Sequence, residues 1–123
     1  MNLVDSSGWL EYFADGKNTE HFAPIINDVE RLIVSTINIY EVFKRILQQR
    51  DENDALQAAA VMQQALVVDV TAAVSLLAAG ISYGMKLPMA DSLILATAKS
   101  MNAILWTQDS DFIGIPDVRY VKK

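Results

Sequence analysis

The sequence contains no cysteine and a single histidine, His21. Without cysteine the chain has no disulfide bonds and no thiolate zinc site, which is compatible with a reducing compartment. One histidine cannot supply the pair of acid–base groups, often histidines, that a metal-free ribonuclease commonly uses. We therefore expect His21 to have a solvated structural role on a surface helix.

Positive charge is also scarce, because 10 Lys and Arg face 15 Asp and Glu, for a net charge of −5. A basic face is the usual mark of a nucleic-acid binder. This balance argues mildly against one, unless metal ions and a few local cations hold the nucleic acid.

The chain also lacks an evident targeting or membrane segment. The N-terminus has no basic region before Asp5 and does not resemble a signal peptide. The longest charge-free run, Val70 to Met85, is shorter than the ~20 residues of a membrane-spanning helix. We expect a buried helix there, no membrane contact, and a cytoplasmic protein.

What the sequence does contain is enough apolar residues, 52% of 123, for one domain spanning residues 1–123. Short apolar runs at residues 2–4, 32–34, 66–68, 103–106 and 118–121 predict strands. Helical patterns separate them, with starts expected at Ser7, Ser35, Asp51, Thr71 and Pro88. The predicted fold class is α/β, with a short four- or five-stranded parallel sheet covered by helices on both faces.

Acidic residues recur at one edge of this predicted sheet, where parallel α/β proteins bind ligands. Asp5 follows the first strand, and Asp109 and Asp111 follow the fourth. Glu41 lies in the second turn of the helix after the second strand, and Asp91 in the first turn of the helix before the fourth. Each has an ordinary alternative, such as a helix-dipole contact, a turn or a solvated face. Together they predict one acidic cluster.

Crowded carboxylates repel one another and raise a pKa unless a cation lies between them. An all-oxygen ligand set without histidine or cysteine suits Mg²⁺ or Mn²⁺. Such a site supports metal-assisted phosphoryl chemistry. Asp69 also follows a strand, but Thr71 starts a helix directly after it, and we expect Asp69 not to bind metal.

Four stretches, NLVDSSGWLEYF, STINIYEVF, LPMADSLILATA and ILWTQDSDF, resemble the four acidic motifs of the PIN-domain nucleases. More narrowly, they resemble the VapC-type toxins of bacterial and archaeal toxin–antitoxin pairs. The resemblance covers nearly the whole chain and keeps the order of the motifs. It implies a PIN-like sheet and a divalent-metal endoribonuclease acting on RNA. It also implies a cytoplasmic homodimer that a cognate antitoxin silences.

The resemblance also implies roles for individual residues. By motif position, the catalytic acids are Asp5, Glu41, Asp91 and Asp109, and the metal ligands are Asp5, Asp91, Asp109 and Asp111. Ser7 and Thr107 match small polar residues that support the metal site. Gly8 departs from the family pattern, in which a branched apolar residue is expected, and this glycine is expected to loosen the start of the first helix.

Two surfaces are candidates for partners. The candidate phosphate contacts, for which ordinary solvated charges are an equal alternative, are Lys44, Arg45, Arg50 and Lys86. The first two helices carry more apolar side chains than they can easily bury, which predicts an exposed groove for an antitoxin helix. The alternative is that they fill the core or a homodimer interface. These side chains are Trp9, Leu10, Tyr12, Phe13, Phe22, Ile25 and Ile26.

Two other functions compete with the nuclease. The first is a non-catalytic PIN-like interaction module that keeps the acidic edge as a relic. The second is a phosphotransfer or phosphatase domain, which needs a second aspartate after the first strand or a nucleophilic aspartate supported by a lysine. Here the first strand is followed by Asp5-Ser6-Ser7, so that second aspartate is missing.

Overall fold

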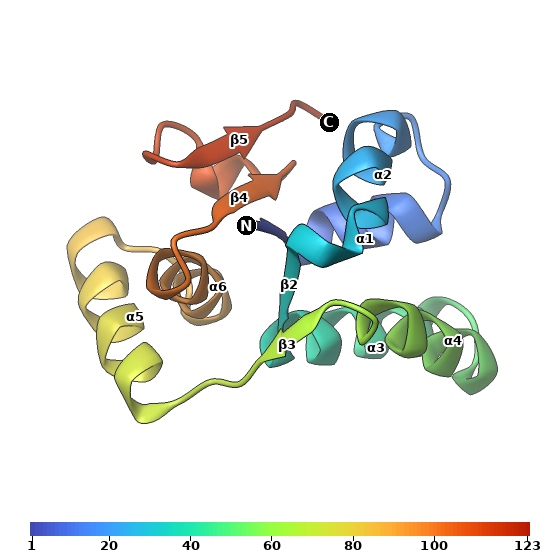
Figure 1. The fold of residues 1–123 in the computed structure, drawn as a ribbon, viewed down its shortest axis with the longest axis horizontal. Helices are drawn as coiled ribbons and strands as arrows, with labels where there is room; N and C mark the ends of the chain where they lie inside the picture. Colours follow the sequence, from blue (N-terminus) through green and yellow to red (C-terminus); the bar gives the residue numbers. More distant parts are fainter.

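A computed structural model describes residues 1–123, and its centre is a five-stranded parallel sheet (Figure 1). The strand order is β3-β2-β1-β4-β5, and every neighbouring pair is parallel. The strands are β1 (Asn2–Val4), β2 (Leu32–Ser35), β3 (Leu66–Val68), β4 (Ile104–Thr107) and β5 (Val118–Tyr120). The predicted fold class is confirmed, with the fifth strand present.

Helices cover both faces of the sheet (Figure 1). One face carries α1 (Ser6–Phe13), α2 (Thr19–Asn27), α3 (Thr36–Gln49) and α4 (Glu52–Met62). The other carries α6 (Met89–Ser100), against which α5 (Ala72–Met85) packs. Two short 3₁₀ helices, η1 (Val29–Arg31) and η2 (Ser110–Phe112), complete the chain.

The central strands are apolar on both sides because both sides are buried. Leu3 is paired with Ile33 and Leu105, and these three side chains form a row under α6. The next residue, Val4, and its neighbour Val34 face the opposite cluster beneath α1 to α4. This two-sided burial fixes where each strand ends, and therefore where the residues after it emerge.

Local side-chain caps start most of the helices. Ser35, Asp51 and Thr71 each accept a hydrogen bond from a backbone N–H in the first turn of the helix that follows, as predicted. The predicted cap Ser7 is wrong, because the Asp5 carboxylate accepts the Ser7 N–H and caps α1. The first helix therefore begins immediately after β1, with no intervening loop.

Helix α5 is not the buried helix that its charge-free sequence predicted. Only Val74 and Ala78 are buried, whereas Leu76 is 77% and Tyr83 91% exposed. The helix rests on α6 along a narrow stripe, and nothing in the chain covers its other sides. No single helix is both long and apolar enough to span a membrane; α5 and α6 satisfy length and composition only jointly, across a bend of 119°.

The first two helices bury their largest side chains. Trp9 and Phe22 are fully buried, and Ile26 is nearly so, in the cluster beneath α1 to α4. Contrary to the prediction, Trp9, Phe22 and Ile26 therefore do not line an exposed groove, whereas Leu10 and Phe13 of the same predicted set are partly buried and do line one. The physical reason is that α1 packs against β1 and β4 and α2 packs against β1, which takes the inward faces of both helices into the core.

Gly8 has a packing role that the sequence did not reveal. A Cβ atom at this position would lie 2.6 Å from Val4 Cγ1 and 2.8 Å from Phe22 Cε1. Those separations are shorter than van der Waals contact, so only glycine fits beside the Phe22 ring. Gly8 therefore allows close packing of α1, β1 and α2, and the expected loosening of α1 stays a prediction.

Candidate metal centre

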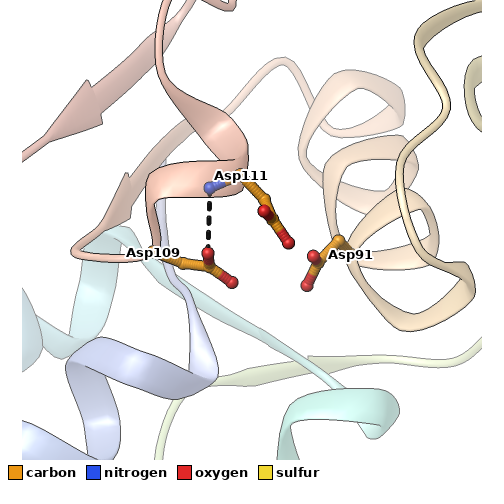
Figure 2. Close-up of side chains that lie close together, drawn as sticks. All are labelled: Asp91, Asp109 and Asp111. Atoms are coloured by element: carbon orange, nitrogen blue, oxygen red, sulfur yellow. Dashed lines mark hydrogen bonds between the residues drawn. The ribbon is translucent and has the colours of Figure 1, made fainter.

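Three aspartates converge at the carboxyl edge of the sheet. Asp109 and Asp111 follow β4, and Asp91 lies in the first turn of α6. One carboxylate oxygen from each lies within 4.8 Å of the others. Figure 2 shows the three side chains pointing toward a common space. The structure thus brings together three of the four predicted metal ligands; below they are called the aspartate trio.

The turn after β4 orients two of these aspartates. The Asp111 N–H donates to Asp109 Oδ1 at 2.9 Å, which starts η2 (Figure 2). Phe112, fully buried, anchors the turn to the core. Asp109 Oδ2 accepts no hydrogen bond from the protein and remains available to the trio. Asp109 is therefore both a turn former and a possible metal ligand, two roles that the sequence presented as alternatives.

Asp5, the fourth predicted ligand, lies beside the trio and is only 3% exposed. Its Oδ2 accepts hydrogen bonds from Ser7 Oγ at 2.7 Å and Thr107 Oγ1 at 2.9 Å, while Oδ1 accepts none. Thr107 Oγ1 also accepts the Asp109 N–H at 2.9 Å. Thr107 thus holds two acids that follow two different strands, and Ser7 and Thr107, the predicted supporting residues, both donate to Asp5.

Burial and mutual repulsion perturb two of these carboxyls. Burial raises the pKa of Asp5 above its usual range, Ser7 and Thr107 lower it, and the charges of Asp109 and Glu41 raise it. The pKa of Asp91 is raised from 3.8 to about 7, chiefly by burial. The charges of Asp109 and Asp5 raise it further, and so do the hydrogen bond and the charge of Asp111. A cation within this group would relieve the repulsion.

Glu41 does not join the trio but is held nearby through a second set of hydrogen bonds. Ser6 Oγ donates to Glu41 Oε1 at 2.7 Å, and Asn38 Nδ2 donates to Ser6 Oγ at 3.0 Å. Asn38 is fully buried, and its Oδ1 accepts the Ser35 N–H. The sequence interpretation missed Ser6 and Asn38. The capping-box spacing from Ser35 to Asn38 was the available signal.

The donor set fits a hard divalent cation. All the gathered donors are carboxylate oxygens, as Mg²⁺ and Mn²⁺ prefer. The raised pKa of Asp91 reports crowding that such an ion would relieve. The residues that would hold it are the trio. Asp5 is close enough for its charge to raise the pKa of Asp91, and its Oδ1 accepts no hydrogen bond.

The remaining predicted residues lie outside the trio. Lys44, Arg45 and Lys86 are exposed, and none forms an ion pair. Arg50 pairs with Asp54 at 3.7 Å. Asp69 is exposed and does not belong to the group.

His21 is not solvated as predicted. Its ring centroid lies 5.7 Å from that of Trp106, and its Nε2 is buried without a hydrogen-bond partner. The His21 side chain lies between α2 and the sheet because α2 packs directly against the sheet.

The raised pKa of Asp91 predicts a pH-dependent difference in stability. Between its ordinary pKa of 3.8 and about 7, the folded protein binds more protons at this site than the unfolded chain does. The Asp91 contribution therefore falls as pH rises through that window. We expect the Tm of Asp91→Asn, measured in EDTA, to exceed that of the wild type more at pH 8 than at pH 5. A pH-independent difference would contradict the raised pKa.

Comparison with known proteins adds independent observations. The sequence model of the PIN domain matches residues 3–118. No curated protein matches the sequence. A toxin–antitoxin complex from Klebsiella pneumoniae aligns over 100% of both chains, with 20% identity and a TM-score of 0.83.

Two further solved structures are similar along their whole length. VapC20 from Mycobacterium tuberculosis, described as a sarcin–ricin loop cleaving toxin, has 16% identity over 100% of this chain and 98% of its own, with a TM-score of 0.77. DNA-bound VapBC from Salmonella typhimurium has 16% identity over 99% and 98%, with a TM-score of 0.77. At these identities the structural similarity establishes the fold.

Proposed function

Because the chain belongs to the PIN domain family, we propose that it is a divalent-metal-dependent endoribonuclease and the cytoplasmic toxin of a toxin–antitoxin pair. Residues 1–123 act as one nuclease domain. The observation that carries this proposal is the aspartate trio at the carboxyl edge of the sheet, with buried Asp5 beside it. The similarity to toxin–antitoxin structures supports the toxin assignment.

The acids divide into two roles in the proposed reaction. The trio, with Asp5 Oδ1, would hold Mg²⁺ or Mn²⁺. When bound, the ion supplies an activated water and charge neutralisation at the leaving oxygen of an RNA phosphodiester. Ser7 and Thr107 fix the other oxygen of Asp5. Glu41, held by Ser6 through Oε1, keeps Oε2 free to accept a hydrogen bond or proton from water at this edge.

Local cations would offset the net charge of −5 toward RNA. Lys44, Arg45 and Lys86 are exposed and unpaired, which leaves them available for phosphate oxygens. Lys44 and Arg45 follow Glu41 by about one helical turn, and Lys86 ends α5 just before the helix that carries Asp91. Their positions, on or next to the helices that carry Glu41 and Asp91, support phosphate contacts.

The nuclease function is tested by RNA cleavage in Mn²⁺ or Mg²⁺ against EDTA. We expect internal cleavage that requires metal and leaves no 2′,3′-cyclic phosphate, because the nucleophile is water and not the 2′-OH. Cleavage in EDTA, or a cyclic product, would contradict this mechanism. A folded protein that cleaves no RNA in metal would favour the non-catalytic interaction module.

For the antitoxin, the structure offers a groove between α1, α3 and α4. It has a volume of about 240 Å³. Apolar side chains of Leu10, Phe13 and Val61 line it, and Arg50 and Asp54 lie at its rim. An amphipathic antitoxin helix could bury its apolar side there. Leu10 and Phe13 belong to the set predicted for the groove, whereas Trp9, Phe22 and Ile26 of that set are buried.

For the homodimer, the exposed side of α5 is the best-supported interface. Leu76 and Tyr83 of α5 are 77% and 91% exposed, Met89 at the start of α6 is 76% exposed, and no charge occurs between Asp69 and Lys86. Contiguous exposed apolar residues commonly mark an interface. Two chains of charge −5 repel each other least where an uncharged face meets its copy.

Two glycines in α5 support the same interface. A Cβ atom at Gly80 or Gly84 would meet no atom within 4 Å, so packing within the chain does not require glycine there. Each glycine nevertheless destabilises the helix by about 1 kcal/mol relative to alanine. Close approach of a second helix at these positions would explain why both Gly80 and Gly84 are glycine.

A reciprocal pair of variants separates the two surfaces. Leu76→Lys should convert the dimer to a monomer, measured by light scattering, without weakening antitoxin binding. Val61→Lys should keep the dimer and weaken antitoxin binding at least tenfold, a loss of about 1.4 kcal/mol. A folded Leu76→Lys variant that remains dimeric would contradict the α5 interface, and unchanged antitoxin affinity in Val61→Lys would contradict the groove.

A further inference from the structure

Gln108 lies between two residues of the site, Thr107 and Asp109. Its side chain is buried, with the residue only 7% exposed. Its backbone N–H donates to Ser7 Oγ at 3.2 Å, and its Nε2 donates to the Ser7 carbonyl at 3.4 Å. The glutamine thus holds Ser7 through both its main chain and its side chain.

Ser7 is the residue that passes this restraint to the acids. Its hydroxyl has one hydrogen, which it donates to Asp5 Oδ2 at 2.7 Å. Because Gln108 N–H donates to the same hydroxyl oxygen, the Ser7 hydrogen is directed toward Asp5 and away from Gln108. The orientation of Asp5 therefore depends on how firmly the segment after β4 is held against the start of α1.

Asn18 holds Gln108 from the far side. Its Nδ2 donates to Gln108 Oε1 at 2.9 Å and to the Lys122 carbonyl at 3.1 Å. Its backbone N–H donates to Glu11 Oε2 at 2.9 Å, which ties the turn before α2 to α1. Three segments far apart in the sequence therefore meet at one buried amide.

We propose that Gln108, held by Asn18, is a positioning residue that sets the orientation of Asp5 toward the aspartate trio. This inference rests on the proposed metal-dependent function. Gln108 is buried, so it does not touch the substrate and acts through Ser7. Its loss should weaken metal binding and turnover and leave RNA binding unchanged.

The main variant is Gln108→Met, which keeps the length of the side chain and removes both of its hydrogen bonds. We expect Mn²⁺ affinity, titrated on the metal-free protein, and kcat each to fall about tenfold, as happens when residues behind metal ligands are changed. KM for RNA should stay within about twofold, since buried groups act on turnover through the site they orient. The matched control is Gln63→Met, at an exposed residue just after α4, where only a hydrogen bond to Ala59 O is lost.

Asn18→Ala provides the second variant. Asn18→Ala should also reduce Mn²⁺ affinity and kcat. Combining it with Gln108→Met should add no further loss, because both variants remove the hydrogen bond between Asn18 and Gln108. If Gln108→Met does not fold, the half-buried Asn18 decides the question alone.

Wild-type Mn²⁺ affinity and kcat in a folded Gln108→Met variant would overturn the proposal. So would a loss confined to KM, or fully additive losses in the double variant. If the wild type binds Mn²⁺ and cleaves no RNA, the nuclease function fails, whereas the Mn²⁺ affinities of these variants still test the positioning role.

Discussion

Asp91→Asn should abolish metal-dependent RNA cleavage while the protein stays folded. Changes to residues behind metal ligands reduce activity about 10- to 100-fold, so removing a ligand carboxylate should reduce kcat/KM more than about 100-fold. Asparagine matches aspartate in shape, and Asp91 is only partly buried, which leaves the fold intact. The readout is the initial rate of cleavage in Mn²⁺.

The same variant should melt at a higher temperature than the wild type in EDTA. Burial and the charges of Asp109, Asp5 and Asp111 all disfavour an ionised Asp91, and the neutral amide escapes them. The matched control is Asp69→Asn, an exposed acid just after β3 that lies outside the trio. Near wild-type cleavage in folded Asp91→Asn would remove Asp91 from the site.

Phe22→Ala should lower the free energy of unfolding by about 3–5 kcal/mol, the range for deleting a buried aromatic side chain. Phe22 is fully buried in the cluster beneath α1 to α4, with Trp9 and Val4. Since small proteins have only about 5–15 kcal/mol of stability, the variant should be close to unfolding. Urea denaturation followed by circular dichroism measures the change.

An exposed apolar residue provides the control for this prediction. Ile113 is 59% exposed, and Ile113→Ala should change the free energy of unfolding by less than about 0.5 kcal/mol. If Phe22→Ala left stability unchanged and weakened antitoxin binding, the groove originally predicted around Phe22 would be restored.

The sequence predicted the elements well where their causes are local. Ser35, Asp51 and Thr71 precede helical patterns within a few residues, and each acts as the cap. The acidic edge was predictable for a similar reason. Parallel strands align their carboxyl ends, so residues just after β1 and β4 must emerge together.

The hydrogen bonds that hold the acids were not predictable, because they join residues distant in the sequence. Ser6 and Glu41 are 35 residues apart, and Gln108 and Asn18 are 90 apart. Nothing in the neighbourhood of Gln108 distinguishes it from an exposed turn residue. Only the packing of β4 beside β1 brings its amide to Ser7.

The prediction that α5 is buried was wrong for another reason. Its apolar sequence correctly indicates that the helix belongs in an apolar environment. Periodicity does not say whether the same chain or another molecule supplies it. The exposure of Leu76 and Tyr83 shows that this chain does not.

Gly8 and Phe22 share one volume, and this has a consequence for how related sequences can diverge. A Cβ at position 8 would lie 2.8 Å from the Phe22 ring and 2.6 Å from Val4 Cγ1, so a larger residue at position 8 requires a smaller one at position 22 and a shift of Val4. Relatives with a branched residue at position 8 should carry a residue smaller than phenylalanine at position 22. The two sites should therefore covary although 14 residues separate them. A chain that crosses from one pairing to the other through a single substitution would pass through an overpacked or cavity-containing intermediate, each a less stable protein.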